Sequence, residues 1–358
     1  MEILPRTLGT RPRLACEVRA EGVVAARAED ASAVLEAVSR VALAEEVVVP
    51  RLSGADTGAF AASGVSAGSS GRAAMVAAVR TALEAVSLKG RDVTLVVPDA
   101  AVRVLLLDFD ELPAKEAEAL PVVRFRLKKL LPFDADDAAV SFQVMATAKE
   151  SIQVMAVAMP HAVLTDYESV VREAGFEPGA VLPSTLAALA GLGEGEQPRL
   201  VVNAGREGVT TAIVKGGVLL LHRTVDLGAE VPAATASADP AKEQAAETSI
   251  AAIAARMASA GSPAPATSSP MSQKAQANEV AQAVSVAAAY FEDTLETAPS
   301  VLLVAGTLGA EALTGVLDDA YVGPLAVQEM VERQTLGAGV TAAVPLGWLA
   351  GVRGALAN

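Results

Sequence analysis

Alternation of apolar and polar positions predicts short strands around one long helix in the first part of the chain. The predicted strands are Arg13–Val18, Val23–Arg27, Glu46–Pro50 and Asp92–Pro98. An alanine-rich segment between the last two strands, Arg72–Val86, has a helical pattern. Three strands, a helix and a further strand indicate an α/β fold.

A second set of elements follows, and it has the size of a small subdomain. Leucine and valine recur at helical spacing in Lys115–Leu130, which Pro121 either kinks or begins and which Pro132 ends. The strands predicted around this helix are Val102–Leu107, Ala139–Thr147 and Ser151–Ala158. We also expect a helix over 160–174, closed by a left-handed Gly175.

Glycine, glutamate and proline at 193–198 mark a domain boundary, after which three strands open the chain again. The later elements are predicted at Leu200–Asn203, Val209–Lys215, Val218–Thr224, Glu279–Leu295, Ser300–Val304, Gly309–Leu317 and Ala343–Val352. Between them, Val231–Ala277 is rich in Ala, Ser, Pro and Thr and is predicted to be a disordered insertion. We therefore expect a first domain over 1–193, with the small subdomain at about 101–159, and a second over 194–358.

Composition narrows the classes of function. The net charge of −14 argues against DNA and RNA, because Lys and Arg supply most of the affinity for nucleic acids. Although 52% of the residues are hydrophobic, we expect neither a transmembrane segment nor a signal peptide. A single cysteine, Cys16, fits a reducing cytoplasm, and two histidines far apart in sequence argue against a His/Cys metal site.

Two halves that each open with three strands resemble the two-domain actin-like, ribonuclease H-like fold. The stretch Leu131–Val144, preceded by Glu111–Glu116, resembles the PilM family of type IV pilus assembly proteins, as does Val344–Arg353. The resemblance extends over nearly the whole chain except the predicted insertion. It implies a small α/β subdomain inserted into the first domain.

The same resemblance implies a role in the cell. It implies a cytoplasmic scaffold of the inner-membrane assembly platform that binds the cytoplasmic N-terminal tail of PilN in a groove between the first strand set and the small subdomain. Other pilus platform or motor proteins are further partners of this kind of scaffold. The membrane would be reached only indirectly, through these partners.

An actin-like fold holds ATP and Mg²⁺ between two phosphate-binding hairpins, and this chain departs from the expected residues in both. In the first hairpin Glu17 keeps the acidic charge, but Arg19 and Ala20 replace the small residues that let phosphate approach. In the second, the acidic position is Asn203, which can neither act as a base nor give a metal an anionic ligand. Gly205 lies two residues further along the chain, where it either lets a phosphate approach the backbone or simply forms the hairpin turn.

The turn beside the adenosine would read Gly-Gly and here reads Ala305-Gly306. The added methyl group obstructs a nucleotide only if the backbone of residue 305 needs a positive φ. Glu17, Asn203, Gly205 and Gly306 are thus the residues of a degenerate nucleotide site. We expect no cofactor and no catalytic residue, and the departures argue against hydrolysis more strongly than against ATP binding.

The densest group of cations in this acidic chain is Arg124, Arg126, Lys128 and Lys129. It either meets an acidic partner or acidic lipid headgroups, or forms a solvated face paired with nearby carboxylates. We assign Arg124 and Arg126 to partner binding, where their charge would steer the encounter.

Two other functions remain open. One is an ATP-binding or ATP-hydrolysing actin-like protein of a pilus or secretion machine. The other is a small-molecule kinase of the actin-like superfamily, which would need a carboxylate base near the first hairpin.

Overall fold

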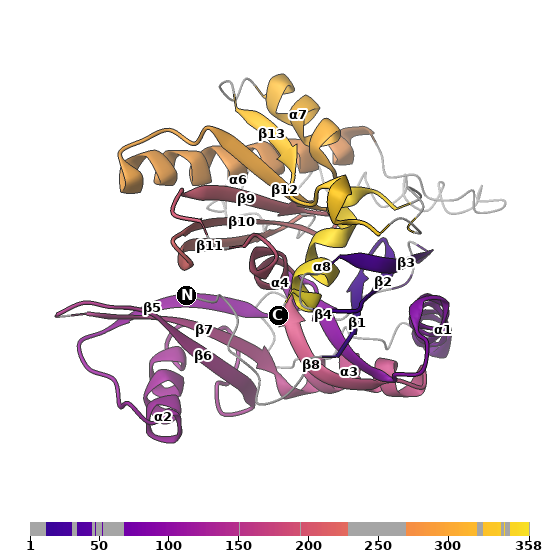
Figure 1. The fold of residues 1–358 in the computed structure, drawn as a ribbon. Coiled ribbons are helices and arrows are strands. Elements are labelled where there is room, and N and C mark those ends of the chain that lie inside the picture. The colour runs from indigo at the N-terminus through magenta and orange to yellow at the C-terminus, as the bar shows by residue number, and fades with distance from the viewer. Residues whose placement is uncertain are drawn as a thin grey trace, which may run out of the picture.

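The computed structural model describes residues 12–30, 34–44, 47, 52, 68–149, 151–193, 195–227, 270–320, 325–337, 340 and 344–357 of the chain. These residues form two similar halves, each built on a five-stranded sheet, and a small subdomain that extends from the first half (Figure 1). None of the helices in these ranges is long and apolar enough to cross a membrane.

The first sheet has the strand order β3-β2-β1-β4-β8. Its strands are β1 (Leu14–Arg19), β2 (Gly22–Ala28), β3 (Leu35–Ala42), β4 (Asp92–Val97) and β8 (Glu177–Pro183). The first three are antiparallel, whereas β4 is parallel to β1 and β8 is parallel to β4. Every residue of β1 is buried, which places this strand at the centre of the fold.

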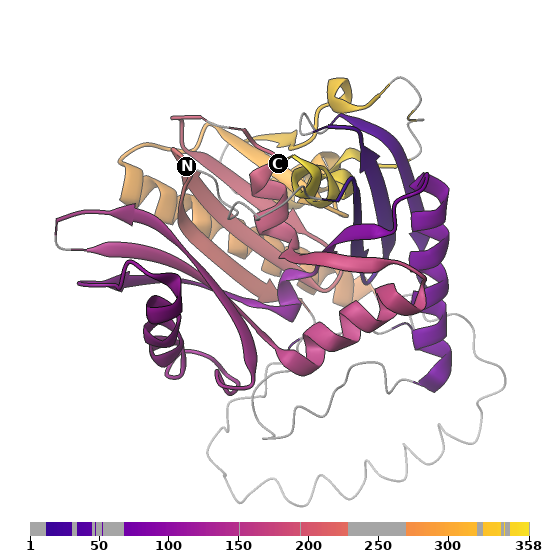
Figure 2. The same cartoon turned by 60° about the horizontal axis from the view of Figure 1, so that its bottom comes forward.

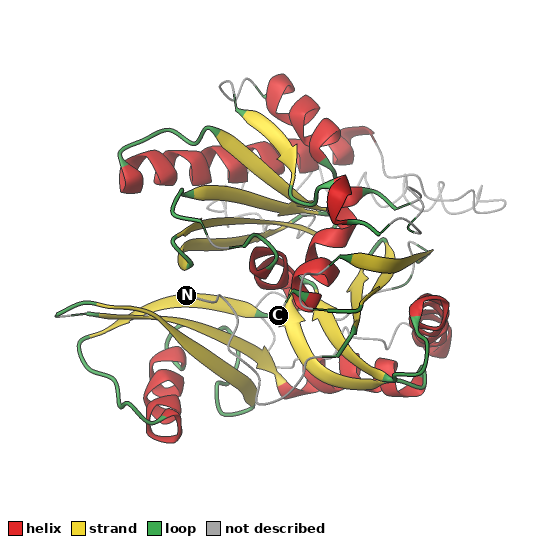
Figure 3. Ribbon diagram, in the orientation of Figure 1, coloured by secondary structure: helices red, strands yellow, loops and turns green. Residues whose placement is uncertain are grey.

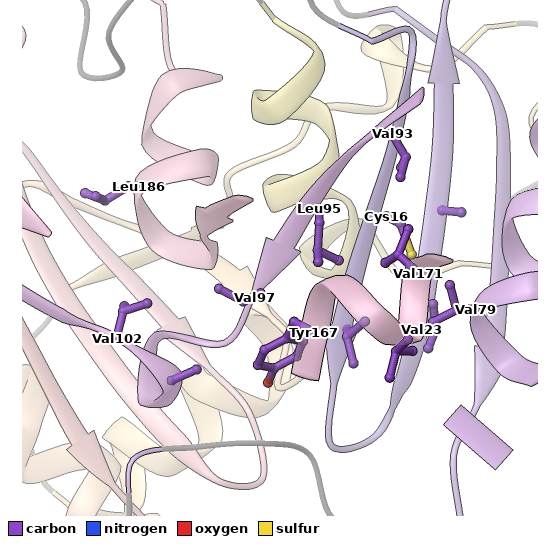
Figure 4. Packing of buried hydrophobic residues seen from close by; sticks show 14 of the residues in the cluster. Cys16, Val23, Val79, Val93, Leu95, Val97, Val102, Tyr167, Val171 and Leu186 are labelled. Atoms are coloured by element: carbon purple, nitrogen blue, oxygen red, sulfur yellow. The ribbon is translucent and has the colours of Figure 1, made fainter. Parts of the chain in front are cut away.

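Helices cover both faces of the first sheet. Helices α1 (Gly68–Val86) and α3 (His161–Glu173) pack on one face, and Figure 4 shows Tyr167 and Val171 of α3 near the side chains of β1 and β4. The other face is covered by α4 (Ser184–Ala190) and by α8 (Ala350–Leu356), which follows a 3₁₀ turn at Leu346–Leu349. Helix α8 follows the whole second half in the chain, so the backbone returns to the first sheet.

The second sheet repeats the order, as β11-β10-β9-β12-β13. Its elements are β9 (Arg199–Ala204), β10 (Gly208–Lys215), β11 (Val218–Asp226), α6 (Pro270–Leu295), β12 (Val301–Gly306), α7 (Ala310–Asp319) and β13 (Ala326–Glu329), with a 3₁₀ turn at Arg333–Thr335. Helices α6 and α7 cover its outer face through an aliphatic core. Helices α4 and α8 lie between the two sheets (Figure 3), and residues of both halves line a cleft beside the start of α4.

The small subdomain is a three-stranded antiparallel sheet with one helix on it. It follows a 3₁₀ turn at Asp99–Ala101 and contains β5 (Arg103–Phe109), α2 (Glu116–Leu127), β6 (Ala138–Thr147) and β7 (Ile152–Pro160). The strand order is β5-β7-β6, so β6 is an edge strand. Helix α2 packs on one face, and β11 of the second half lies against β5 (Figure 2).

The predicted α/β class and the repeated three-strand opening are confirmed, and several boundaries are corrected. The third strand is Leu35–Ala42, whereas most of the predicted strand 46–50 lies outside the described residues. The predicted insertion lies outside them as well, up to residue 269, but α6 begins at Pro270 and not at Glu279. Strands β8 and β13 and helix α4 had no counterpart in the prediction, and the closing helix runs further, to Leu356.

Candidate functional site

The β1–β2 and β9–β10 hairpins face each other across the cleft, at the end where the central strands stop. Glu17 and Arg19 lie on β1, and Asn203 lies on β9. Polar residues at the carboxyl ends of two parallel strands add to them: Asp99 follows β4, and Ser184 follows β8 at the start of α4. In open α/β sheets this edge is where ligands bind.

Arg19 fills the space between the hairpins. Its guanidinium donates hydrogen bonds to Oδ1 of Asn203, at 3.2 Å from Nη1 and 3.3 Å from Nη2, and to Oγ of Ser184 at 2.8 Å. The Nη2 atom also pairs with Oε1 of Glu17 at 2.5 Å. Arg19 is buried, so one side chain joins the first sheet, α4 and the second sheet.

Glu17 is completely buried beside this cation. Its Oε1 accepts a hydrogen bond from the Ser184 hydroxyl at 2.6 Å, while Oε2 has no hydrogen-bond partner. A Cβ on Gly351 of α8 would clash with Oε2, so the start of α8 excludes water from this oxygen. Burial raises the pKa of the Glu17 carboxyl above its usual 4.5, although the charge of Arg19 lowers it in part.

Asn203 completes a buried polar network on the side of the second half. Its Nδ2 donates to Ser184 Oγ at 2.8 Å, to Thr185 Oγ1 at 3.0 Å and to Asp99 Oδ2 at 3.3 Å. The backbone N–H of Thr185 donates to Asp99 Oδ1 at 3.0 Å. Asn203 can serve both Arg19 and Asp99 because an amide carries an acceptor and two donors, whereas an aspartate would only accept.

A second connection ties the hairpin tips to each other. Oε1 of Glu21, at the first tip, accepts the backbone N–H of Arg206 at 2.5 Å and the hydroxyl of Thr307 at 2.6 Å. The guanidinium of Arg206 donates to the backbone carbonyl of Ala20 at 2.9 Å. Glu21 and Ala20, at the tip of the first hairpin, therefore lie directly against the second hairpin.

Two glycines allow this close packing. A Cβ on Gly205 would lie 3.0 Å from Oε1 of Glu21, so the missing side chain lets the hairpins meet. Gly306 has φ 94°, and a Cβ there would clash with the backbone of Ala204. Ala305 is buried with no positive φ, so its methyl group fits without backbone strain.

The cavity left in the cleft is small, at about 50 Å³. Pockets that take small molecules and cofactors are several times larger, about 300–1,000 Å³. Within the ranges that the structure describes, no three His, Cys, Asp or Glu side chains come together as a metal would require.

A larger cavity of about 320 Å³ lies in the small subdomain, between its helix and its sheet. The lining is mainly apolar and consists of Leu112, Pro113, Ala114, Glu116, Ala119, Phe142, Val144, Thr147 and Ile152. Phe142 and Val144 come from the edge strand β6. We call this cavity the subdomain groove.

The two arginines assigned to partner binding have different surroundings. Arg124 is half-buried and donates to the backbone carbonyls of Ala135 and Ala138, the latter at 2.9 Å, so it holds the loop that leads into β6. Arg126 points to solvent. Neither lines the subdomain groove.

Of the residues predicted for a degenerate nucleotide site, the structure brings Glu17, Asn203, Gly205 and Gly306 to one cleft. Ser184, Thr185 and Asp99 were missed by the sequence reasoning. The sequence contains a signal for two of them: Asp99 follows Pro98, just after the end of β4, and Ser184 follows Pro183, the last residue of β8.

No protein-family profile matches the chain, and no curated protein matches its sequence. Among solved structures, the fold is similar to a chain of the PilM–PilN type IV pilus biogenesis complex, with a TM-score of 0.67 at 16% identity over 96% of this chain and 98% of that chain. The ethanolamine utilization protein EutJ from Carboxydothermus hydrogenoformans matches with a TM-score of 0.43 at 10% identity over 98% and 91% of the two chains. A Bacteroides thetaiotaomicron protein with an actin-like ATPase fold matches with 0.41 at 9% over 88% and 90%. The match at a TM-score of 0.67 shows that the chain has the two-domain actin-like fold, in the form found in the pilus complex.

Proposed function

We propose that this protein is a non-catalytic actin-like scaffold of a type IV pilus or a related secretion machine, and that it binds the cytoplasmic tail of a PilN-type membrane protein. The likeness to the PilM–PilN complex supports the setting, since it spans both chains almost completely. It also supports the expected place of action, in the cytoplasm at the inner membrane.

The proposal rests mainly on the volumes of the two cavities described above. The cleft that would take a nucleotide keeps about 50 Å³, whereas the subdomain groove has about 320 Å³. Arg19 occupies the position that phosphate would need, and Asn203 supplies no carboxylate for a metal. The residues present therefore do not fit ATP with Mg²⁺. Glu21 and Asp99, which line the cleft and could be considered as a kinase base, already accept hydrogen bonds from within the protein.

The subdomain groove suits an extended apolar peptide. Its lining is aliphatic and aromatic, with Glu116 and Thr147 as its polar members, so affinity would come from burial of apolar side chains. Strand β6 lies at the sheet edge, where a peptide can pair through main-chain hydrogen bonds. We therefore place the tail inside the subdomain, and not between the subdomain and the first strand set.

Titration of the full chain with a synthetic PilN tail peptide tests this assignment. Phe142→Ala with Ile152→Ala should weaken binding about tenfold or more, because two apolar contacts are lost. Val140→Ala is the matched control, since Val140 packs from the same strand without lining the groove, and it should leave binding unchanged. Equal loss in all variants, or no binding by the wild type, would refute the groove.

A thermal-shift titration with ATP and Mg²⁺ tests the other half of the proposal. We expect no rise in melting temperature, because a nucleotide would have to displace the buried contacts of Arg19. A saturable rise at micromolar ATP would favour the ATP-binding alternative.

A further inference from the structure

Helix α2 exposes an apolar patch on the side away from its own sheet. Phe125 is 68% exposed, Val122 is 38% exposed, and Leu130, in the turn after the helix, is 49% exposed. Seven large apolar side chains are exposed among the described residues, and these three fall within nine positions of the chain. A concentration of this kind marks a binding surface, whereas single exposed apolar residues do not.

Cations surround Phe125. Arg126 and Lys129 are exposed, and neither forms an ion pair with a described carboxylate. The nearby charges are otherwise engaged: Lys128 pairs with Asp136 at 2.5 Å, and Arg124 holds the backbone of the following loop. The α2 patch, defined as Val122, Phe125, Arg126, Lys129 and Leu130, therefore combines an apolar tip with two unpaired positive charges.

Carboxylates stand close to the α2 patch in the chain, since Asp134 and Asp136 follow Leu130, and Asp136 pairs with Lys128. The net charge is −14, yet α2 projects at the end of the molecule opposite α6 and α7 (Figure 1). Exposed charges separated by more than about 8–10 Å are largely screened at physiological ionic strength. Carboxylates farther than this from Arg126 and Lys129 therefore weaken the attraction of these two cations to an anionic surface only slightly.

We propose that the α2 patch docks on a membrane surface that carries anionic lipids. Phe125 would enter the interface between headgroups and acyl chains, and Arg126 and Lys129 would contact the headgroup phosphates. The patch is on the outer side of a helix, and neither described cavity opens at any of its five residues, so it offers a peptide no pocket. Aromatic and aliphatic tips with Lys and Arg beside them are typical of helices that bind membrane interfaces.

This contact is direct, and it goes beyond the indirect association implied by the resemblance. It is independent of the subdomain groove, although both lie on α2. Each cation near an anionic surface contributes about fivefold in affinity, so the contact is weak alone and would orient a scaffold that partners already hold at the membrane.

Vesicle flotation of the full chain tests the proposal. The wild type should float with vesicles of phosphatidylglycerol and phosphatidylethanolamine and stay unbound with phosphatidylcholine alone. Phe125→Ala should reduce flotation several-fold, and Arg126→Ala with Lys129→Ala should remove the preference for anionic lipid. Leu88→Ala with Lys89→Ala is the matched control, because this exposed apolar and cationic pair follows α1, on another side of the molecule (Figure 1).

The proposal is overturned if the wild type does not float with the anionic vesicles, which would leave an acidic protein as the occupant of the patch. It is also overturned if the Leu88 and Lys89 variant loses as much binding as the patch variants. Unchanged circular dichroism of every variant keeps misfolding from imitating a loss of binding. No protein partner is present, so failure here is separate from failure of the peptide titration.

Discussion

The guanidinium of Arg19 lies 3.2 Å from Oδ1 of Asn203, although the two residues are 184 positions apart in the chain. Each belongs to the central strand of its own sheet. The two sheets are therefore joined by a buried hydrogen bond between their central strands.

Replacement of Arg19 by methionine should cost about 3–5 kcal/mol in free energy of unfolding, because the buried Glu17 carboxyl loses its cation. Urea denaturation measures this change. A second Glu17→Gln substitution should recover part of the loss, with a coupling energy of about 1–3 kcal/mol in the double-mutant cycle. Additive effects of the two substitutions would show that the ion pair contributes little.

The pH dependence of stability should carry the signature of Glu17. The pKa of the Glu17 carboxyl is raised in the folded protein. At pH values between 4.5 and this raised pKa, the folded state therefore holds a proton that the unfolded chain has lost. Stability contributed by this group is therefore present below pH 4.5 and declines as the pH rises through that window. Relative to Glu17→Gln, the wild type should lose free energy of unfolding between acidic and neutral pH, and an increase would contradict the shift.

The crossing of α4 and α8 should not tolerate a methyl group at Gly354. A Cβ there would clash with the backbone carbonyl of Ala187, and rigid backbone cannot move aside. Gly354→Ala should therefore lower the free energy of unfolding by about 1–3 kcal/mol or more. Gly315→Ala is the control, because nothing lies within 4 Å of its Cβ in the exposed part of α7, and it should raise stability by up to about 1 kcal/mol.

The two arginines of α2, Arg124 and Arg126, should differ in how much each contributes to the free energy of unfolding. Arg124→Ala removes hydrogen bonds to the carbonyls of Ala135 and Ala138 and should cost about 1.5–3 kcal/mol. Arg126→Ala, in solvent on the same helix, should change stability by less than about 0.5 kcal/mol. Equal costs would mean that the loop does not depend on Arg124.

Much of the fold follows from local sequence, and the exceptions have physical causes. The strand Leu35–Ala42 carries three polar residues and only two β-branched ones, so its pairing with β2 decides its structure. The prediction chose the valine run after Glu46 instead, because valine has a high β-propensity. Strand β8 was missed because Pro178, Gly179 and Pro183 interrupt it, which an edge position tolerates.

The sequence allows us to predict how the site differs from an actin-like nucleotide site, but not which side chains contact one another in it. The resemblance implies a small residue where Arg19 stands, and this difference is the reason for the prediction that phosphate does not bind. The sequence cannot show that Ser184 and Asn203 receive the guanidinium, since those contacts depend on how the two sheets and α4 pack together. The charge of Arg124 likewise suggested a partner surface, whereas in the structure its side chain holds the loop before β6 through hydrogen bonds to two backbone carbonyls.

The return of α8 to the first sheet has a consequence for biosynthesis. Helix α8 covers Ala15, Val24 and Val96, and these residues leave the ribosome long before α8 does. Until α8 has been made, one face of the first sheet lacks part of its cover and exposes apolar side chains. Nascent chains should therefore depend on chaperones late in translation, and stalled chains that stop before Leu346 should be more prone to aggregation than the full-length product.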